Sequence, residues 1–181
     1  MAHLFLSHFG VLDKVKITPA GGTSTTILAA LKQGVIGGAI LAQPTGAASA
    51  AGFKELVNGV KLGVPFAQGN IIVTRAYAKD HPDLVKSYLR AYVQGWRFAS
   101  DPANKAEMVK IFQKYTSTDA RVSEDGYSAQ LPVWQLTKTP AVNAEAFANT
   151  LKFGSSDKIK GVDPKQFFDN SFIEQASAGL P

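Results

Sequence analysis

VKITPAGGTSTTILAALKQGVIGGAIL, residues 15–41, is the stretch that decides the expected fold. Residues 15–19 are typical of a short buried strand, and residues 25–33 repeat apolar side chains at helical spacing. Residues 35–41 form a second apolar run of strand length. A strand, a helix and a second strand in this order predict a parallel βα unit. The right-handed crossover would bring strand ends and helix starts to one rim of the sheet.

The same alternation continues to about residue 75, after which the pattern becomes helical. A small alanine-rich helix ending near Ala51 is expected after Gln43-Pro44, followed by strands at 54–57 and 69–74. A connector containing glycine and proline, residues 59–68, separates these two strands. Beyond them the spacing predicts helices at 82–99, 102–115, 119–130, 144–153 and 171–178, with a short helix after Asp163-Pro164. The sequence therefore predicts an α/β fold with an α-helical C-terminal half.

Within these helices the sequence also predicts caps and core residues. Asp80 can cap the helix that begins near Pro82, and Leu84, Tyr88 and Val93 recur on its apolar face. The next helix is expected to turn Val109, Phe112 and Tyr115 toward the core.

The composition is that of an ordinary globular protein, and it excludes several kinds of site. The 181 residues are 45% hydrophobic and 18% charged, with three histidines and no cysteine. Without cysteine the chain has no disulfide framework, thiolate nucleophile, cysteine zinc site or iron–sulfur cluster. The net charge of +5 arises from singly scattered basic residues, a pattern that does not indicate a nucleic-acid partner.

The apolar beginning of the chain, from Met1 to Gly10, is not typical of a targeting or membrane segment. It lacks a basic stretch and is too short for a signal peptide with its cleavage site. No segment reaches the roughly 20 apolar residues that span a bilayer. The beginning instead resembles the end of an amphipathic helix that Gly10 stops, which predicts that more chain preceded it.

The sequence lacks the motifs of the common enzyme classes. It contains no G-x-S-x-G elbow, no phosphate-binding loop with its lysine, and no G-x-G-x-x-G fingerprint. His81 lies at a helix start between an aspartate and a proline, which is typical of a surface residue. Asp119, Glu124 and Asp125 are expected on a solvated helix face.

One segment has the composition of a small-anion site. In Gly21-Gly22-Thr23-Ser24-Thr25-Thr26 the glycines let a ligand approach the backbone, and the hydroxyl and N–H groups at a helix start favour negative charge. An ordinary turn with a capping threonine is the alternative interpretation. Gln43 offers an amide after the next strand, and Phe66 in the connector is the better aromatic candidate for a pocket wall.

The order of these features resembles a known family. The resemblance is carried by LAALKQG at 28–34 with the following strand and Gln43-Pro44, GNIIVTR at 69–75, HPDLV at 81–85, YVQG at 92–95 and DPKQFFDNSF at 163–172. In this order and spacing the chain resembles the substrate-binding proteins of ABC transporters in the nitrate/sulfonate/taurine and thiamine-precursor (NMT1/THI5-like) group. The resemblance extends over essentially the whole chain and depends on order rather than on one motif.

The resemblance implies a type II periplasmic-binding-protein-like fold in which two lobes with a parallel-rich sheet close on a ligand. Residues 1–66 match the later part of lobe two. Residues 67–181 match the return crossing, the last part of lobe one and the C-terminal helices. The first segment of lobe one and the first strand of lobe two have no match, which implies a C-terminal fragment with an incomplete two-lobe fold.

The resemblance also implies binding without catalysis, cofactor or metal. The residues it places in the cleft are Gly22, Thr23, Ser24, Ala42, Gln43, Phe66 and Asn70. Amino-acid-binding relatives carry an acidic residue near the position of Ala42, so a sulfonate, nitrate or uncharged heterocycle is favoured over an amino acid. The implied partners are this small molecule and an ABC permease, and the implied location of the parent protein is periplasmic or extracytoplasmic.

Two other functions stay open at this point. Some members of the same fold group synthesise a thiamine pyrimidine precursor and rely on histidine and cysteine-rich segments, which this chain lacks. A ligand-sensing or assembly module is the other, in which an exposed lobe edge pairs with a second copy to form a homodimer. Because about half of the implied site has no match, the isolated chain is expected to bind its ligand weakly, and micromolar binding in calorimetry would contradict that expectation.

Overall fold

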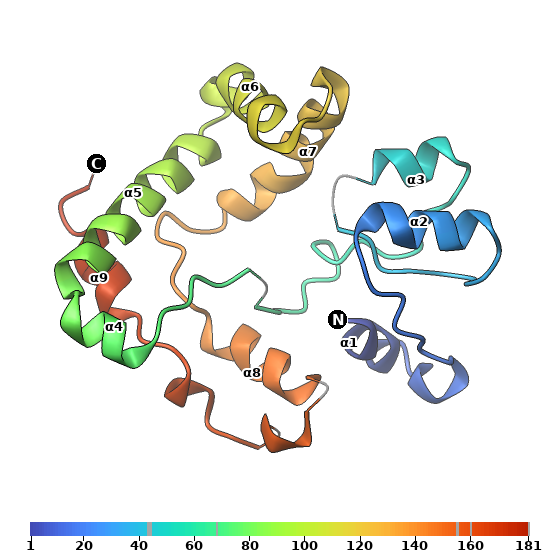
Figure 1. Ribbon diagram of the computed structural model, residues 1–181, viewed down its shortest axis with the longest axis horizontal. Helices are drawn as coiled ribbons and strands as arrows, with labels where there is room; N and C mark the ends of the chain where they lie inside the picture. The colour runs from blue at the N-terminus through green and yellow to red at the C-terminus, as the bar shows by residue number, and fades with distance from the viewer. Residues whose placement is uncertain (43–44, 68, 155, 160, 181) are drawn as a thin grey trace. The chain divides into compact units, whose positions relative to one another are not determined.

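The computed structural model describes residues 1–42, 45–67, 69–154, 156–159 and 161–180 (Figure 1). The α-helices of the described chain are α1 (Ala2–His8), α2 (Ser24–Lys32), α3 (Gly46–Ala50), α4 (Arg75–Asp80), α5 (Pro82–Ser100), α6 (Lys105–Thr116), α7 (Ala120–Trp134), α8 (Ala144–Lys152) and α9 (Ser171–Ser177). Short 3-10 helices accompany them: η1 (Leu12–Lys14), η2 (Pro102–Asn104), η3 (Asp157–Ile159) and η4 (Pro164–Gln166).

The predicted α/β fold is wrong for this structure. The chain is 57% helical, and the residues that the structure describes include no strand and no sheet. The segments predicted as strands, at 15–19, 35–41, 54–57 and 69–74, run as irregular chain instead. The described residues therefore do not form a type II periplasmic-binding-protein-like fold with a parallel-rich sheet.

The physical reason for the difference is that a strand depends on a partner. A helix satisfies its backbone hydrogen bonds within itself, whereas a strand satisfies them only in a ladder with a neighbour. No such ladder forms within the described ranges, so apolar residues of the predicted strands lie on the surface. Val35, Leu56 and Ile72 are 71%, 88% and 86% exposed. Such β-branched and aliphatic side chains favour a pleated, half-buried surface. This preference does not by itself form a strand when no neighbouring strand is present.

The chain divides into two compact units, Met1–Gly63 and the remainder from Val64. The predicted lobe boundary lies between residues 66 and 67. That the two units correspond to parts of two lobes stays a prediction.

The first unit contains α1, η1, α2 and α3. Leu4 in α1 and Ala48 in α3 are its buried apolar residues. The α1 helix ends before Gly10, as predicted, and α2 ends before Gly34. Gly34 has a φ of +70°, its N–H donates to the carbonyl of Leu31, and the N–H of Val35 donates to that of Ala30. This left-handed C-terminal turn favours glycine over any residue with a Cβ.

The second unit is built around the packing of α5, α6 and α7. Its core cluster comprises Ala99, Met108, Val109 and Tyr127, with Ile111, Phe112, Leu131 and Trp134 packed against it. Val109 and Phe112 therefore lie in or against the core, as predicted. Tyr115, predicted to do the same, is 74% exposed in the last turn of α6.

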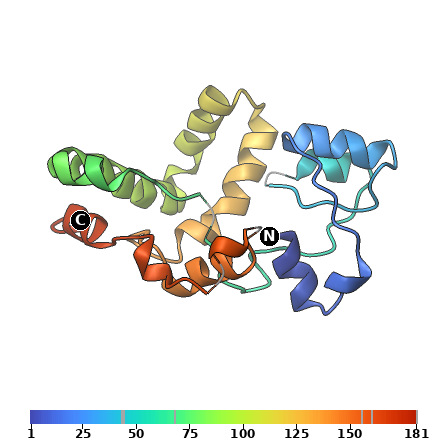
Figure 2. The same cartoon turned by 60° about the horizontal axis from the view of Figure 1, so that its bottom comes forward.

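The α9 helix packs along α5 in the same unit (Figures 1 and 2). Ile173 and Ala176 are buried on α9, and Val93 is completely buried on α5. Arginines of α5 hold the C-terminal segment through its carbonyl groups. Arg90 donates to the carbonyls of Ala176 and Ala178, both at 3.2 Å, and Arg97 donates to that of Leu180 at 2.9 Å. Cations at the end of a helix also complement its dipole.

Several helix starts form where the sequence predicts them. Asp119 accepts the N–H of Val122 at 2.8 Å, and Asn143 accepts that of Ala146 at 2.9 Å. Asp101 and Asp163 cap η2 and η4 in the same way. Asp80, by contrast, does not cap α5, because it is the last residue of a separate helix, α4.

A testable consequence concerns Asp169, which precedes α9. Its carboxylate accepts the N–H of Ser171 at 2.9 Å, and hydrogen bonds from the side chain and backbone of Ser171 lower the pKa of Asp169 below its ordinary value. A carboxyl group whose pKa is lowered in the folded state stabilises the fold at neutral pH, and the contribution is lost as pH falls through that lowered pKa.

We therefore expect Asp169→Ala to cost a few tenths to about 1 kcal/mol at pH 7, because the group is exposed. The cost should shrink once the pH falls well below 3.8, the ordinary value for an aspartate. Urea unfolding of both proteins across this range measures the difference. A cost that is independent of pH would show that the charge of Asp169 is not involved.

Candidate functional site

The first turn of α2 holds three of the residues predicted from the sequence. Gly22 precedes the helix, Thr23 is its N-cap residue and Ser24 is its first helical residue, and all three are exposed. Gly22 has a φ of +76°, and a Cβ built on it would lie 3.0 Å from Oγ1 of Thr26. Only glycine therefore fits this approach to the helix without strain.

The N–H groups of this turn face solvent rather than a capping side chain. In the described part of the chain Thr23 makes no side-chain cap bond, and its Oγ1 lies 3.5 Å from Oγ1 of Thr26. The N–H of Ile27 donates to the carbonyl of Thr23 at 3.1 Å, which begins the helical hydrogen-bond pattern. The four preceding N–H groups lack an intrahelical acceptor, as at every helix start. Together with the helix dipole they can accept a small anion or a ligand carbonyl.

The α2 and α3 helices both belong to the first unit and run in the same direction in Figure 1. Ala42 is exposed in the segment that leads to α3. Gln43, the predicted amide donor and acceptor, lies outside the described residues.

The other two predicted residues, Phe66 and Asn70, belong to the second unit. Phe66 is half-buried and Asn70 is exposed. The structure therefore brings Gly22, Thr23 and Ser24 together, and their convergence with Phe66 and Asn70 on one ligand stays a prediction.

The position of Phe66 is fixed by α8, which the sequence did not indicate. Asn149 Nδ2 donates to the carbonyl of Pro65 at 2.8 Å. Thr150 Oγ1 accepts the N–H of Ala67 at 3.1 Å and donates to its carbonyl at 3.0 Å. Neither Asn149 nor Thr150 carries a sequence signal for this role, because the partners lie more than 80 residues away along the chain.

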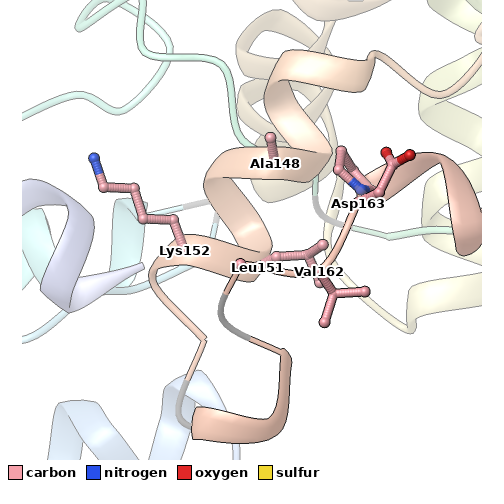
Figure 3. A pocket seen from close by; sticks show the side chains of 7 residues that line it. Ala148, Leu151, Lys152, Val162 and Asp163 are labelled. Carbon is pink, nitrogen blue, oxygen red and sulfur yellow. The ribbon is translucent and has the colours of Figure 1, made fainter.

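A hollow lies beside α8, and none of the predicted site residues is in its described lining (Figure 3). Its described lining is largely aliphatic and consists of Ala148, Leu151, Lys152, Gly161, Val162, Asp163 and Pro164. Lys152 extends away from Asp163 in Figure 3. The carboxylate of Asp163 accepts the N–H of Lys165 at 3.0 Å. The two charges do not converge on a common point, so the hollow has the chemistry of an apolar surface groove.

The residues of the first turn of α2, from Thr23 to Thr26, carry hydroxyl groups and no ionisable side chain. His3, His8 and His81 are all exposed, and the ring of His81 packs against that of Tyr77 at 4.8 Å. Within the described ranges no three histidine or acidic side chains could hold a metal ion together. None of the helices described here combines the length and apolar character needed to cross a membrane. The hydroxyl and backbone N–H groups are therefore the binding chemistry that this turn offers.

The NMT1/THI5-like family model matches residues 1–106 of the chain. This range contains every residue predicted to bind ligand, from Gly22 to Asn70, and ends just beyond η2. No curated protein and no solved structure matches the chain. Because the family model covers more than half of the sequence, the chain belongs to the NMT1/THI5-like family, which includes solute-binding proteins and thiamine-synthase-like members.

Proposed function

We propose that this chain is a solute-binding component of an ABC importer, or part of one, and that it binds a small organic anion or an uncharged heterocycle. A sulfonate, nitrate or a thiamine-precursor-like compound is the expected class of ligand. The proposed partner is an ABC permease, and the proposed location is periplasmic or extracytoplasmic. The proposal rests on the family match together with one observation, the exposed N–H groups and hydroxyls at the first turn of α2.

The residues of this turn would bind without performing a reaction. The N–H groups of Thr23 to Thr26 donate to an anionic or carbonyl oxygen, and the hydroxyls of Thr23 and Ser24 can add two further bonds. The absence of a side chain at Gly22 keeps the backbone open to the ligand. Ala42 offers no negative charge that could hold an ammonium group, so an amino acid ligand is disfavoured.

The affinity of this turn alone should be low. Its residues are all exposed, so water competes for each N–H group and screens the charge of the ligand. A dissociation constant of about 1 mM, equivalent to about −4 kcal/mol, is the expected order for such a contact. This agrees with the weak binding that the sequence predicts for the isolated chain.

Ligand-observed saturation-transfer NMR tests the proposal, since it detects weak binding and reports the chemical fate of the ligand. Methanesulfonate and an aminopyrimidine are offered separately, with glycine as the comparison ligand. We expect transfer to methanesulfonate or to the pyrimidine, none to glycine, and ligand spectra that stay unchanged for hours. If neither methanesulfonate nor the pyrimidine shows saturation transfer, the proposed ligand class is wrong.

The same samples separate binding from synthesis. Pyridoxal phosphate and iron are added to the chain, and the spectra are followed for a pyrimidine product. A binding protein leaves both compounds unchanged. Formation of product would overturn the binding role in favour of a thiamine-precursor synthase.

A further inference from the structure

The α5 helix has a second apolar face that points to solvent. Its inner face carries the buried Val93 and Ala99. Its outer face carries five exposed residues, Leu84, Tyr88, Ala91, Gly95 and Phe98, which we call the α5 seam. Leu84 and Tyr88, both expected in the core from their spacing, are 57% and 59% exposed.

The spacing of the α5 seam is that of a helix-pairing surface. Successive members are four, three, four and three residues apart, which is the alternation of the two core positions in a heptad. Residues at this spacing lie in one stripe along a helix. The stripe therefore fits another helix better than it fits a flat or extended partner.

Gly95 leaves the middle of this face without a side chain. It lies inside a 19-residue helix, where glycine weakens the structure relative to alanine. A Cβ built on Gly95 meets nothing within 4 Å, and its φ is not in the left-handed region. No neighbour within the described part of the chain requires a glycine here, and its missing side chain would let another backbone approach the helix closely.

We propose that the occupant is a second copy of this chain, paired through an antiparallel α5–α5 contact. In the register that places residue 84 opposite residue 95, Leu84 lies over the partner's Gly95 and Tyr88 lies over the partner's Ala91. The two-fold axis of the dimer makes each of these facing residue pairs occur twice. Leu84 and Tyr88 then each meet a small residue, and Phe98 lies opposite His81 at the end of the partner helix, so the central part of the α5 seam is complementary to itself, as an isologous interface requires.

The charges around the α5 seam agree with a copy rather than with a charged partner. Ser87 and Gln94, which flank the seam, are uncharged. Asp83, which precedes the first seam residue, is paired with Lys86 of the same helix at 2.8 Å. A neutral face lets two chains of net charge +5 meet locally without repulsion. It gives no attraction to a nucleic acid or an anionic membrane. This pairing differs from the lobe-edge pairing predicted from the sequence.

The association should be weak. The α5 helix is about 28 Å long. A single helix pair of this length buries less than the roughly 800 Å² per partner of a standard interface. We expect a dissociation constant on the order of 100 μM.

Single cysteines test the register directly, because the native chain contains none. In the antiparallel pair, position 91 lies about 4.5 Å along the helix axis from its mate, and position 84 lies about 16 Å from its mate. A short bis-maleimide should therefore link Ala91→Cys into dimers and leave Leu84→Cys as monomers. Equal linking at both positions, or linking at neither, would overturn the proposal.

Sedimentation at concentrations from tens to hundreds of micromolar gives an independent test. The wild-type chain should rise from monomer toward dimer. Gly95→Glu should stay monomeric while its denaturation midpoint rises, because glutamate is the better helix former. Gln130→Glu adds the same charge on an exposed position of α7 and should dimerise like the wild type. A wild-type chain that stays monomeric, or equal behaviour of the two variants, contradicts the α5 pairing.

Discussion

Replacing Tyr127 by alanine is expected to lower the free energy of unfolding of the second unit by about 3–5 kcal/mol. Tyr127 is only 1% exposed, and it joins Ala99, Met108 and Val109 in the core cluster. Its ring lies 5.8 Å from that of Trp134, at the other end of the same core. Truncation removes this packing and leaves a cavity between α5, α6 and α7 that the rigid helices can fill only in part.

Tyr127→Phe is the matched control, since it keeps the ring and removes the hydroxyl. Burial raises the pKa of Tyr127, so the hydroxyl stays protonated at neutral pH and donates to the carbonyl of Asp101 at 3.3 Å. Losing this bond should cost about 1 kcal/mol. Guanidinium unfolding followed by tryptophan fluorescence measures both variants. If alanine costs no more than phenylalanine, Tyr127 does not hold the core together.

Replacing Val93 by aspartate is expected to cost more than 3 kcal/mol and to release α9 from α5. Val93 is completely buried on the helix that packs against α9 and α7. A carboxylate placed there loses its hydration, and either the charge is neutralised at a cost or the helices separate to admit water. Separation would also break the bonds from Arg90 to the carbonyls at the end of α9.

Hydrogen exchange separates release of α9 from general unfolding. The amides of α9 should exchange faster in Val93→Asp, whereas those of α8 keep their native protection unless the whole unit unfolds. Val93→Ala removes volume without adding charge, and it should cost about 2 kcal/mol with α9 still protected. The same result for both variants would show that the position is open to water.

Local chemistry explains which parts of the fold could be predicted from the sequence. Asp119 and Asn143 each mark a helix start because one side chain satisfies an N–H group two or three residues further on. Gly34 marks a helix end because its left-handed turn needs no distant contact. Asp80 misled the prediction because Thr74, which accepts the N–H of Tyr77, starts a separate helix before it.

Non-local pairing explains what could not be predicted. Residues 35–41 and 69–74 have strand composition, yet a sheet requires neighbours that no local pattern reports. The same limit applies to α5. Apolar residues recur at helical spacing on two of its faces, and the spacing does not show which face is buried. Val93 is buried and Tyr88 is exposed on the same helix.

In the candidate site, as in the fold, the local features could be predicted from the sequence and the contacts between distant segments could not. Gly22, Thr23 and Ser24 are continuous in sequence, and the structure places them at one helix start, as their composition indicates. The position of Phe66 depends on Asn149 and Thr150, which hold its neighbours from a distant helix. Contacts between segments that far apart leave no signal in a single sequence.

Amide chemical shifts during a titration with methanesulfonate are the most direct measurement of the proposed function. We expect the amides of Thr23 to Thr26 to shift most, with a dissociation constant of about 1 mM. Gly22→Val should abolish these shifts because valine at positive φ is strained and collides with Thr26. Gly37→Val, in open space without positive φ, should preserve them. Shifts centred elsewhere, such as the hollow beside α8, or equal loss in both variants, would contradict binding at the first turn of α2.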